Sequence, residues 1–447
     1  MSRNHSANQK LYQRAKELIP GGTQLLSKRP EMFAPDVWPS YYAKAKGNKI
    51  WDMEGREYLD MSIMAVGACI LGYADDDVDT AVIEAVKSGS NASLNCPEEV
   101  ELGEVLINLH PWFDQIRYCR SGGEAMSIAV RIARARTGRD KVLFSGYHGW
   151  CDWYLAANLS TDSALDGQLM PGLAPSGVPR GLAGTAIPFF PDNLDGLKDI
   201  VASEKQDVAA IVIEPARAIA ASEEYLAEIS DIAKGIGAVL IFDEITTGFR
   251  SCPGGLHCLY ETKPDIAVLA KSMANGYAMA GIIGKSDVMQ AAQGTFISST
   301  NWTDRIGPTA ALATIRKYVK TNAHLKINSV GAEVKRMWQE KANKHNVDID
   351  ISGIDSLPAF SFGASQAQNM YSAYVREMLQ HNILGFRQFK PSLAHKLADV
   401  DDYAFAVDLV FEKIANMSEQ DLDAIAPAHS GIHHQAHNNH TDQPDGQ

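Results

Sequence analysis

The feature that most constrains the fold is the stretch Ala238–Gly276, in which two apolar runs each lead directly into a charged side chain. The first run, Ala238–Phe242, is followed by Asp243, and the second, Asp265–Ala270, is followed by Lys271. Residues at the carboxyl ends of parallel strands face the crevice in which α/β proteins bind ligands. The sequence therefore predicts that an acid and an amine lie at the same edge of one sheet.

The chemistry of this pair depends on its surroundings. A lysine among apolar neighbours has a lowered pKa and can form a Schiff base with a carbonyl compound. A carboxylate near Lys271 suits a cofactor with a basic ring nitrogen, and pyridoxal phosphate (PLP) needs both groups. The alternative is that Asp243 caps a helix and that Lys271 points into solvent. The assignment of Asp243 and Lys271 to a cofactor site therefore needs support from other residues of the chain.

The order of elements predicts the fold class. Residues 115–285 alternate strand, helix and strand, which predicts an α/β domain with a mostly parallel sheet. The later part of the chain alternates less regularly and predicts a separate small α+β domain. A length of 447 residues allows two or three domains. We expect an N-terminal helix, arm and hairpin belonging to the small domain (1–60), a large domain (61–310), the C-terminal small domain (311–428) and a disordered His-rich tail (429–447).

A glycine-rich turn precedes one of the predicted helices. The strand Gln115–Cys119 leads into Ser121, Gly122 and Gly123, and a helix opens at Glu124. Such a turn presents free N–H groups at a helix N-terminus, where they can bind a phosphate. The alternative is tight packing without a ligand. The turn lacks the P-loop pattern and matches GxGxxG weakly, so a nucleotide is not favoured.

Two further strand ends carry polar or aromatic groups. Tyr147, His148 and Trp150 follow one strand, and an aromatic face there can stack on a flat cofactor ring. The alternative is an aromatic cluster that closes the core. Glu214 follows another buried strand, with Arg217 three positions later. These residues add candidates at the same sheet edge.

Charge and hydropathy argue against several classes of partner. The net charge is −13, which disfavours nucleic acid and anionic membranes as main partners. We expect no transmembrane helix, because the apolar runs are short and interrupted by charges. The N-terminus lacks an apolar segment typical of a secretory signal, so cytoplasm is the expected location.

The cysteines and histidines give little indication of a metal site. None of the six cysteines forms a CxxC pair, and Cys252 and Cys258, with His257 between them, make a poor zinc pattern. The tail 429–447 holds five of the 13 histidines, so metal binding is an alternative to disorder there. We expect no metal.

Taken together, several motifs make the chain resemble the class III PLP-dependent aminotransferases, in particular the branch similar to glutamate-1-semialdehyde aminomutase. The resemblance implies the two-domain PLP-dependent transferase fold of the aspartate aminotransferase type, and a homodimer with active sites at the subunit interface. The motifs that carry it are IPGG (Ile19–Gly22), WDMEGREYLDM, SGGEA (Ser121–Ala125), YHGW (Tyr147–Trp150), EP (Glu214–Pro215), FDEITTGFR (Phe242–Arg250) and AKSMANG (Ala270–Gly276).

The resemblance assigns roles to the cofactor-site residues. Lys271 becomes the Schiff-base lysine and proton shuttle, Asp243 the partner of the pyridinium nitrogen, and Tyr147 the aromatic that stacks on the ring. The backbone at Ser121, Gly122 and Gly123 becomes the phosphate cradle. His148 and Glu214 complete the expected cofactor site. A threonine, Thr303 or alternatively Thr300, is expected to reach the phosphate of the partner subunit's cofactor.

The substrate side departs from the aminomutase pattern. Where that pattern has Ser and a carboxylate-binding Arg after IPGG, this chain has Leu25 and the cations Lys28 and Arg29. Ala-Arg-Ala after Glu-Pro brings Arg217, and ungapped counting places Arg387 at the position of an active-site Glu. These cations are the candidate substrate residues, and the arginines suit an anionic donor or acceptor such as glutamate.

Three functions follow from these patterns. The first is an aminotransferase that passes an amino group from an amino-acid donor, with glutamate as one candidate, to a keto or aldehyde acceptor. The second is an aminomutase that moves the amine within one molecule. The third is a non-catalytic protein with the PLP fold, although such a protein would most simply have lost Lys271 or Asp243.

Overall fold

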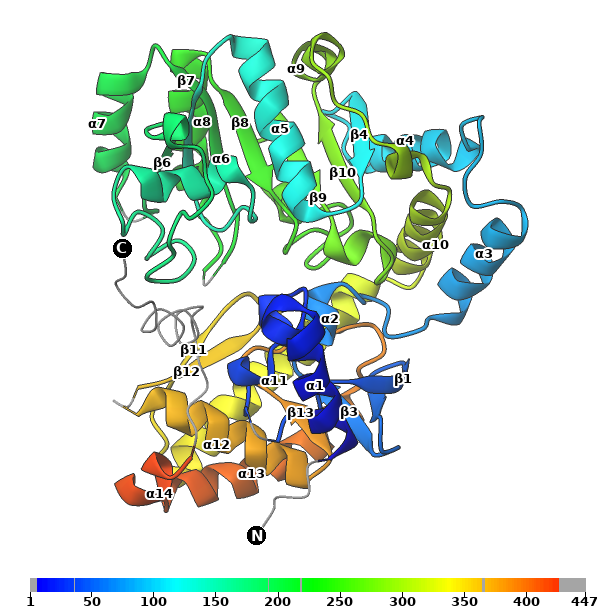
Figure 1. The fold of residues 1–447 in the computed structure, drawn as a ribbon, viewed down its shortest axis with the longest axis vertical. Helices are drawn as coiled ribbons and strands as arrows, with labels where there is room; N and C mark the ends of the chain where they lie inside the picture. The colour runs from blue at the N-terminus through cyan, green and yellow to red at the C-terminus, as the bar shows by residue number, and fades with distance from the viewer. Residues whose placement is uncertain (1–5, 36, 192, 218, 364–365, 426–447) are drawn as a thin grey trace, which may run out of the picture.

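The computed structural model describes residues 6–35, 37–191, 193–217, 219–363 and 366–425, so the predicted tail lies outside the described residues. The described residues form a larger and a smaller body, one above the other in Figure 1. The larger body contains a seven-stranded sheet, and the smaller one contains a four-stranded and a two-stranded sheet. Within the described part of the chain, no helix is long and apolar enough to cross a membrane.

The seven-stranded sheet is parallel except for one strand, β10, which confirms the expected mostly parallel α/β fold. Only residues 270–279 join β9 to β10, and so short a link does not provide the crossover that a parallel pair requires. The strand order is β4 (Gln115–Cys119), β10 (Ala280–Gly284), β9 (Ile266–Leu269), β8 (Val239–Asp243), β7 (Val208–Ile213), β5 (Lys141–Ser145) and β6 (Ala186–Pro188).

The two faces of this sheet have separate apolar cores. Along β7 and β8, Val212 and Ile241 pack on the face covered by α5, whereas Ile211 and Leu240 pack on the face covered by α8. Burial on both faces explains why these strands are continuous apolar runs. The helices of this body are α3 (Asp76–Lys87), α4 (Pro97–Leu109), α5 (Gly122–Thr137), α6 (Asp152–Leu155), α7 (Leu194–Glu204), α8 (Glu223–Ile236), α9 (Ser286–Met289) and α10 (Ile306–Lys320).

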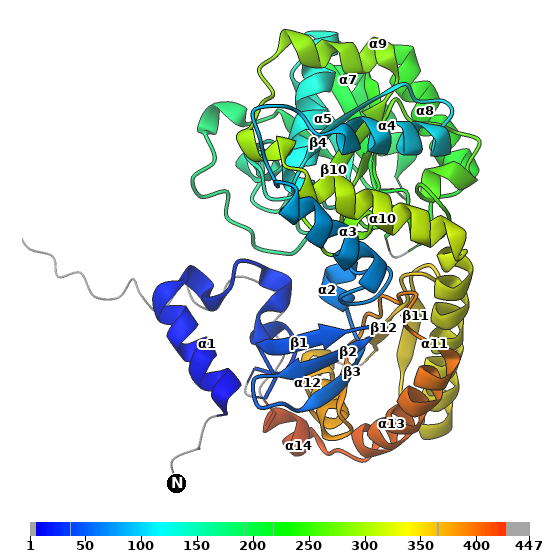
Figure 2. The same cartoon turned by 90° about the vertical axis from the view of Figure 1, so that its right-hand side faces the viewer.

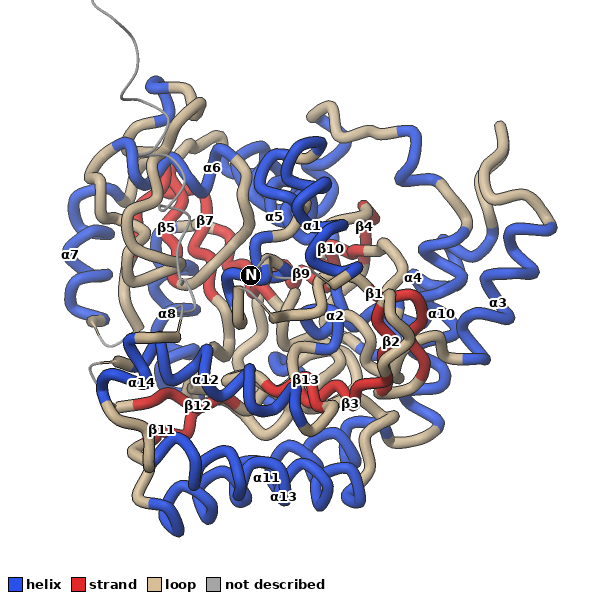
Figure 3. The backbone as a smooth tube through the Cα atoms, turned by 60° about the horizontal axis from the view of Figure 1, so that its bottom comes forward, coloured by secondary structure: helices blue, strands red, loops and turns tan. Residues whose placement is uncertain are grey.

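The smaller body combines the two ends of the chain. The predicted hairpin is confirmed, because β2 and β3 pair antiparallel around a turn in which Gly55 has a φ of 80°. The C-terminal strand β13 then pairs with β3, and helices α11 and α13 lie side by side along one edge (Figure 3). Its elements are α1 (Ala7–Leu18), β1 (Tyr42–Lys46), β2 (Lys49–Asp52), β3 (Glu57–Met61), α11 (Ala323–His345), β11 (Ile349–Ser352), β12 (Ala359–Phe362), α12 (Ala367–Gln380), β13 (Ile383–Gly385), α13 (Leu397–Ala415) and α14 (Glu419–Asp423).

Two segments join the bodies. The helix α2 (Met64–Gly67) lies between them, and α10 is followed closely by α11, which runs down one side of the molecule (Figure 2). The predicted domain limit at 310/311 falls inside α10, whose apolar residues pack with those of α3 and α4. The short 3₁₀ helices are η1 (Pro20–Gly22), η2 (Leu26–Lys28), η3 (Pro30–Met32), η4 (Ala156–Leu159), η5 (Arg180–Leu182), η6 (Leu256–Leu259), η7 (Lys271–Ala274), η8 (Gln290–Gly294) and η9 (Thr300–Thr303).

Candidate active site

A cavity of about 290 Å³ lies at the carboxyl ends of the parallel strands. Asp243 ends β8, and Lys271 follows the neighbouring strand β9, with which β8 is paired in parallel register. The structure thus brings the acid and the amine predicted from the sequence into one cavity. The other predicted residues on its wall are Gly122, Gly123 and Tyr147.

The backbone and side chain of Lys271 are both constrained. Its φ is 39°, a left-handed conformation that costs a non-glycine residue about 1–3 kcal/mol and is found mostly at functional sites. Its Nζ donates a hydrogen bond to Thr246 Oγ1 at 2.8 Å. Burial lowers the pKa of Lys271, and this outweighs the opposite effect of Asp243 and Glu214. The structure therefore favours the neutral, nucleophilic amine more than water does.

Asp243 is held from behind by a buried histidine. His148 Nδ1 lies 2.8 Å from Asp243 Oδ2, and His148 Nε2 lies 3.1 Å from the carbonyl oxygen of Ser145. Both ring nitrogens face oxygen atoms, so the two contacts fix the orientation of the ring. The other carboxylate oxygen accepts the N–H of Ile245 at 3.0 Å. His148 thus positions Asp243, and it is not among the residues that line the cavity.

The glycine turn forms another part of the cavity wall. A Cβ on Gly123 would lie 2.9 Å from Trp150 Nε1, and one on Gly122 would lie 2.9 Å from Ile245 Cδ1. Both glycines are in the first turn of α5, where the helix has no carbonyl partner for their N–H groups. The hydroxyl of Ser121 is bonded to Glu124 in a capping box. The N–H of Ser121 also donates to Glu124 Oε2, at 2.9 Å, so of the predicted cradle only the N–H groups of Gly122 and Gly123 are available to a phosphate.

Glu214 supports the aromatic wall of the cavity. Its Oε2 accepts the N–H of Tyr147 at 3.0 Å and lies 3.1 Å from Arg217 Nη1. Burial raises the pKa of Glu214, and Arg217 opposes this effect. Glu214 itself does not line the cavity. It contacts the backbone of Tyr147, which does line the cavity, and the side chain of Arg217.

These groups fit the PLP implied by the resemblance. The cavity combines an amine, a carboxylate, an aromatic side chain and a helix N-terminus that only glycine can line so closely. They match, in order, the aldehyde, the ring nitrogen, the ring face and the phosphate. A small apolar turn alone would account for the glycines, but it would not account for Lys271 and Asp243 on the same wall.

The four candidate substrate cations lie in different places. Lys28 lines a second cavity of about 620 Å³ between the N-terminal arm and the small-body sheet, which shares Ala68 with the first cavity. The guanidinium of Arg29 packs against Gly21. Arg387 stacks 4.8 Å from the ring centre of Tyr371, and neither cavity includes it. Of the three arginines, only Arg217 contacts a residue of the proposed cofactor site.

A further lysine, Lys390, lies near Lys271, three residues after Arg387. The carbons of its side chain face Gly67, on which a Cβ would lie 3.1 Å from Lys390 Cδ. Its pKa is lowered well below the usual value by burial, and then by Lys271 and Arg250. Lys390 is therefore a cation close to Lys271 that sequence analysis missed. Its place at the start of KPSLAH was the available signal.

Two other residues were missed. Thr246, inside the motif FDEITTGFR, orients Lys271 as described above. Arg250 is only 1% exposed, and its guanidinium donates to the carbonyls of Gly67 at 2.6 Å and Pro391 at 3.2 Å. Burial lowers the pKa of Arg250 to about 10. Arg250 therefore joins the larger body to both segments of the smaller body that close the site.

The two candidate threonines do not face the cavity of their own chain. Both lie on η9 and are exposed, and Thr303 Oγ1 donates to the carbonyl of Thr300 at 2.9 Å. Neither belongs to the two cavities described above. The role of either threonine toward a partner subunit therefore stays a prediction.

Comparisons with known proteins identify the family of this chain. The family model for class-III aminotransferases matches residues 33–389. The chain is 31% identical to the 3-aminobutyryl-CoA aminotransferase of Cloacimonas acidaminovorans, covering 92% of this chain and 97% of that protein. It is 29% identical to a glutamate-1-semialdehyde 2,1-aminomutase of Lachnoclostridium phytofermentans, covering 90% and 98%.

The fold also matches a solved structure that contains PLP. The FumI protein of Sphingopyxis sp. MTA144 superposes with a TM-score of 0.83 at 22% identity, covering 94% of this chain and 98% of that one. The expected PLP-dependent transferase fold and its cofactor are thereby confirmed. The chain belongs to the class-III aminotransferase family of PLP-dependent enzymes.

Proposed function

We propose that the Lys271 amine would hold PLP by condensing with its aldehyde, with loss of water, and that this amine, once displaced by the donor amine, carries the proton between substrate and cofactor. The observation that carries this proposal is that Lys271 Nζ, Asp243 and the Gly122–Gly123 turn line one cavity. PLP, when bound, supplies an electron sink for the substrate carbon. Asp243, held in position by His148, would pair with the ring nitrogen of bound PLP. Thr246 orients the Lys271 amine when that amine is free.

The reaction we propose is amino transfer from an amino-acid donor, with glutamate as one candidate, to a keto or aldehyde acceptor. The relative named 3-aminobutyryl-CoA aminotransferase adds β-amino acyl thioesters to the candidate donors. The larger second cavity, which adjoins the first at Ala68, supports a substrate longer than glutamate. The aminomutase is the second candidate, because relatives of that name cover nearly the whole chain. Leu25, where the mutase pattern has Ser, favours the transferase.

Separate addition of donor and acceptor distinguishes the two functions. A transferase converts one equivalent of donor to its keto product without acceptor, and it completes the cycle only when acceptor is added. Donors would include glutamate, alanine and 3-aminobutyryl thioesters, and loss of the visible absorption of bound PLP would report the first half-reaction. Isomerisation of glutamate-1-semialdehyde without any second substrate would instead establish the mutase.

Replacing Arg217 with alanine is expected to raise KM for an acidic donor about 10–100-fold, which corresponds to one lost charge-assisted contact. PLP affinity should change little, because Arg217 contacts Glu214 rather than the cavity wall. Arg387→Ala is the matched control, since it removes an arginine that stacks on Tyr371 in the smaller body. Steady-state kinetics with several donors would check this. A larger KM increase in Arg387→Ala would contradict it.

We also propose a homodimer with active sites at the subunit interface, and a cytoplasmic location. Support for the dimer comes from large apolar side chains exposed on the larger body: Trp150, on the cavity wall, is 69% exposed, and Leu94 and Phe296 are 84% and 85% exposed. The free state of all six cysteines supports a reducing compartment. Light scattering should give twice the chain mass of 48.7 kDa, and an active monomer would contradict the dimer.

A further inference from the structure

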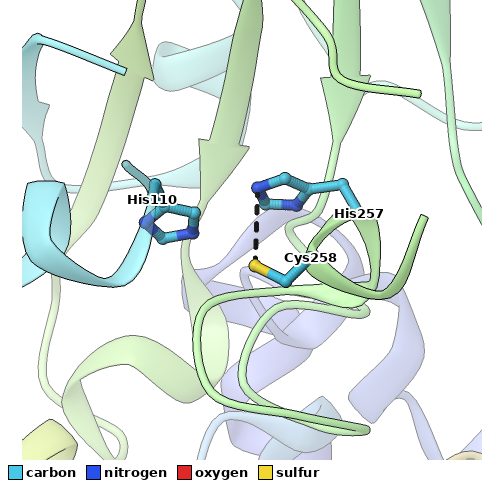
Figure 4. A group of neighbouring side chains, drawn as sticks. All are labelled: His110, His257 and Cys258. Carbon is cyan, nitrogen blue, oxygen red and sulfur yellow. Dashed lines mark hydrogen bonds between the residues drawn. The ribbon is translucent and has the colours of Figure 1, made fainter. Parts of the chain in front are cut away.

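A second cluster of reactive side chains lies in the larger body, away from the cofactor cavity. His110 follows the last residue of α4, and His257 and Cys258 are in η6 (Figure 4). His110 Nε2 or Nδ1, a ring nitrogen of His257 and Cys258 Sγ all lie within 4.8 Å of one another. Both histidines are fully buried, and Cys258 is partly buried. None of the three lines the cofactor cavity.

The outer nitrogen of each imidazole is already occupied. His110 Nδ1 lies 2.7 Å from the carbonyl oxygen of Leu106, and His257 Nδ1 lies 2.7 Å from Glu244 Oε1. Each ring therefore presents Nε2 to the centre of the cluster. A carbonyl or carboxylate behind the second ring nitrogen is the arrangement typical of histidines that bind a metal.

The centre of the cluster contains an unsatisfied polar atom. His110 Nε2 is buried and has no hydrogen-bond partner, whereas buried ring nitrogens are normally bonded. Gly254, with a φ of 95°, passes close by, and a Cβ on it would lie 2.7 Å from His110 Nε2 and 2.8 Å from Cys258 Sγ. A glycine at this position therefore lets the turn pass close to both atoms, where any other residue would clash with them.

We propose that His110, His257 and Cys258 together bind one Zn²⁺ ion, through the two Nε2 atoms and Sγ. Imidazole and thiolate are the ligands that zinc prefers, at about 2.0–2.3 Å. The three atoms must move slightly closer to reach these distances. Three protein ligands leave a fourth position for water or for Cys252, which is buried in the same turn with its Sγ 3.0 Å from the carbonyl of Gly255.

The site would have a structural role. It would fasten the turn after β8 to the end of α4, and Glu244, which holds His257, directly follows Asp243. Sequence patterns alone predicted no metal, because Cys252-x5-Cys258 is a poor zinc spacing and His110 is 147 positions before His257. Only the fold brings the first histidine to the other two residues.

Zinc content of the full-length, PLP-loaded, reduced protein tests this proposal. Each protein is loaded with ZnCl₂, dialysed against a weak chelator and measured by plasma mass spectrometry. Wild type should retain one more zinc per chain than Cys258→Ser and His110→Gln, whose affinity should fall more than about 100-fold. Cys96→Ser, at the other end of α4, is the matched control and should retain wild-type zinc. The histidines of residues 429–447 are present in all four proteins, so their contribution cancels.

X-ray absorption at the zinc edge identifies the ligands. Wild type should show a sulfur shell at about 2.3 Å that Cys258→Ser lacks. Retained PLP absorption shows that each variant has folded, and His110→Gln serves if Cys258→Ser does not fold. Equal zinc contents in all four proteins, or a wild-type spectrum without sulfur, would overturn the proposal and leave an ordinary pair of stacked histidines, whose ring centres lie 5.0 Å apart.

Discussion

Replacing Lys271 with alanine is expected to abolish amino transfer, with a loss of at least about 10⁴-fold in kcat. The variant lacks both the amine that bonds to PLP and the group that moves the proton. It should also lose the visible absorption of bound PLP. The variant should stay folded, because the substitution removes no essential packing contact beyond the hydrogen bond to Thr246. Absorption spectra and single-turnover kinetics would check both effects.

Lys285→Ala is the matched control for this experiment. Lys285 is paired with Asp265 at 2.8 Å, at the opposite end of the same strands, and does not line the cofactor cavity. Its loss should leave the spectrum and kcat unchanged, because surface ion pairs contribute at most about 1 kcal/mol. Residual turnover of Lys271→Ala above one per cent of wild type would show that a different base carries the proton.

The second large effect is expected for Asp243→Asn, which should lower kcat about 10²–10³-fold, the range typical of losing one electrostatic contact to developing charge. Asparagine keeps the size of the side chain but cannot keep the ring nitrogen protonated. In the wild-type protein the two carboxylate oxygens of Asp243 contact His148 and the N–H of Ile245. An amide has only one acceptor oxygen, so it cannot accept from both groups. PLP should still bind, with reduced affinity.

Asp265→Asn controls for the loss of a carboxylate at a strand end. Asp265 Oδ2 accepts the N–H of Leu240 at 2.9 Å, away from the cavity, so this change should reduce stability by about 1 kcal/mol without altering kcat. Stopped-flow spectra would show whether Asp243→Asn slows the chemical step itself. An unchanged chemical step in Asp243→Asn would mean that another acid faces the ring.

Much of the cofactor site was predictable because it lies at strand ends. A buried parallel strand appears in the sequence as a continuous apolar run, so the residue that ends it is easy to locate. Asp243, Lys271 and Tyr147 were found in this way, and so was the glycine turn before α5. The resemblance to class III aminotransferases then gave each of these positions a role, and the geometry of the cavity supports those roles.

What sequence analysis missed depends on contacts between distant segments. Lys390 lies near Lys271 only because the chain after β13 passes close to Gly67, and no sequence periodicity records this approach. The orientation of β10 depends on the length of the link from β9. His110 and His257 meet because α4 ends beside the turn after β8. In each case tertiary packing, and not local pattern, decides the position.

The most direct test of the central proposal is to locate the lysine that bonds to PLP. Borohydride reduction of the loaded enzyme fixes the bond, and peptide mass spectrometry then identifies the modified residue. Two lysines with lowered pKa values compete for this role, Lys271 and Lys390. The account predicts a pyridoxyl group on Lys271, whereas modification of Lys390, or of no lysine, would contradict it.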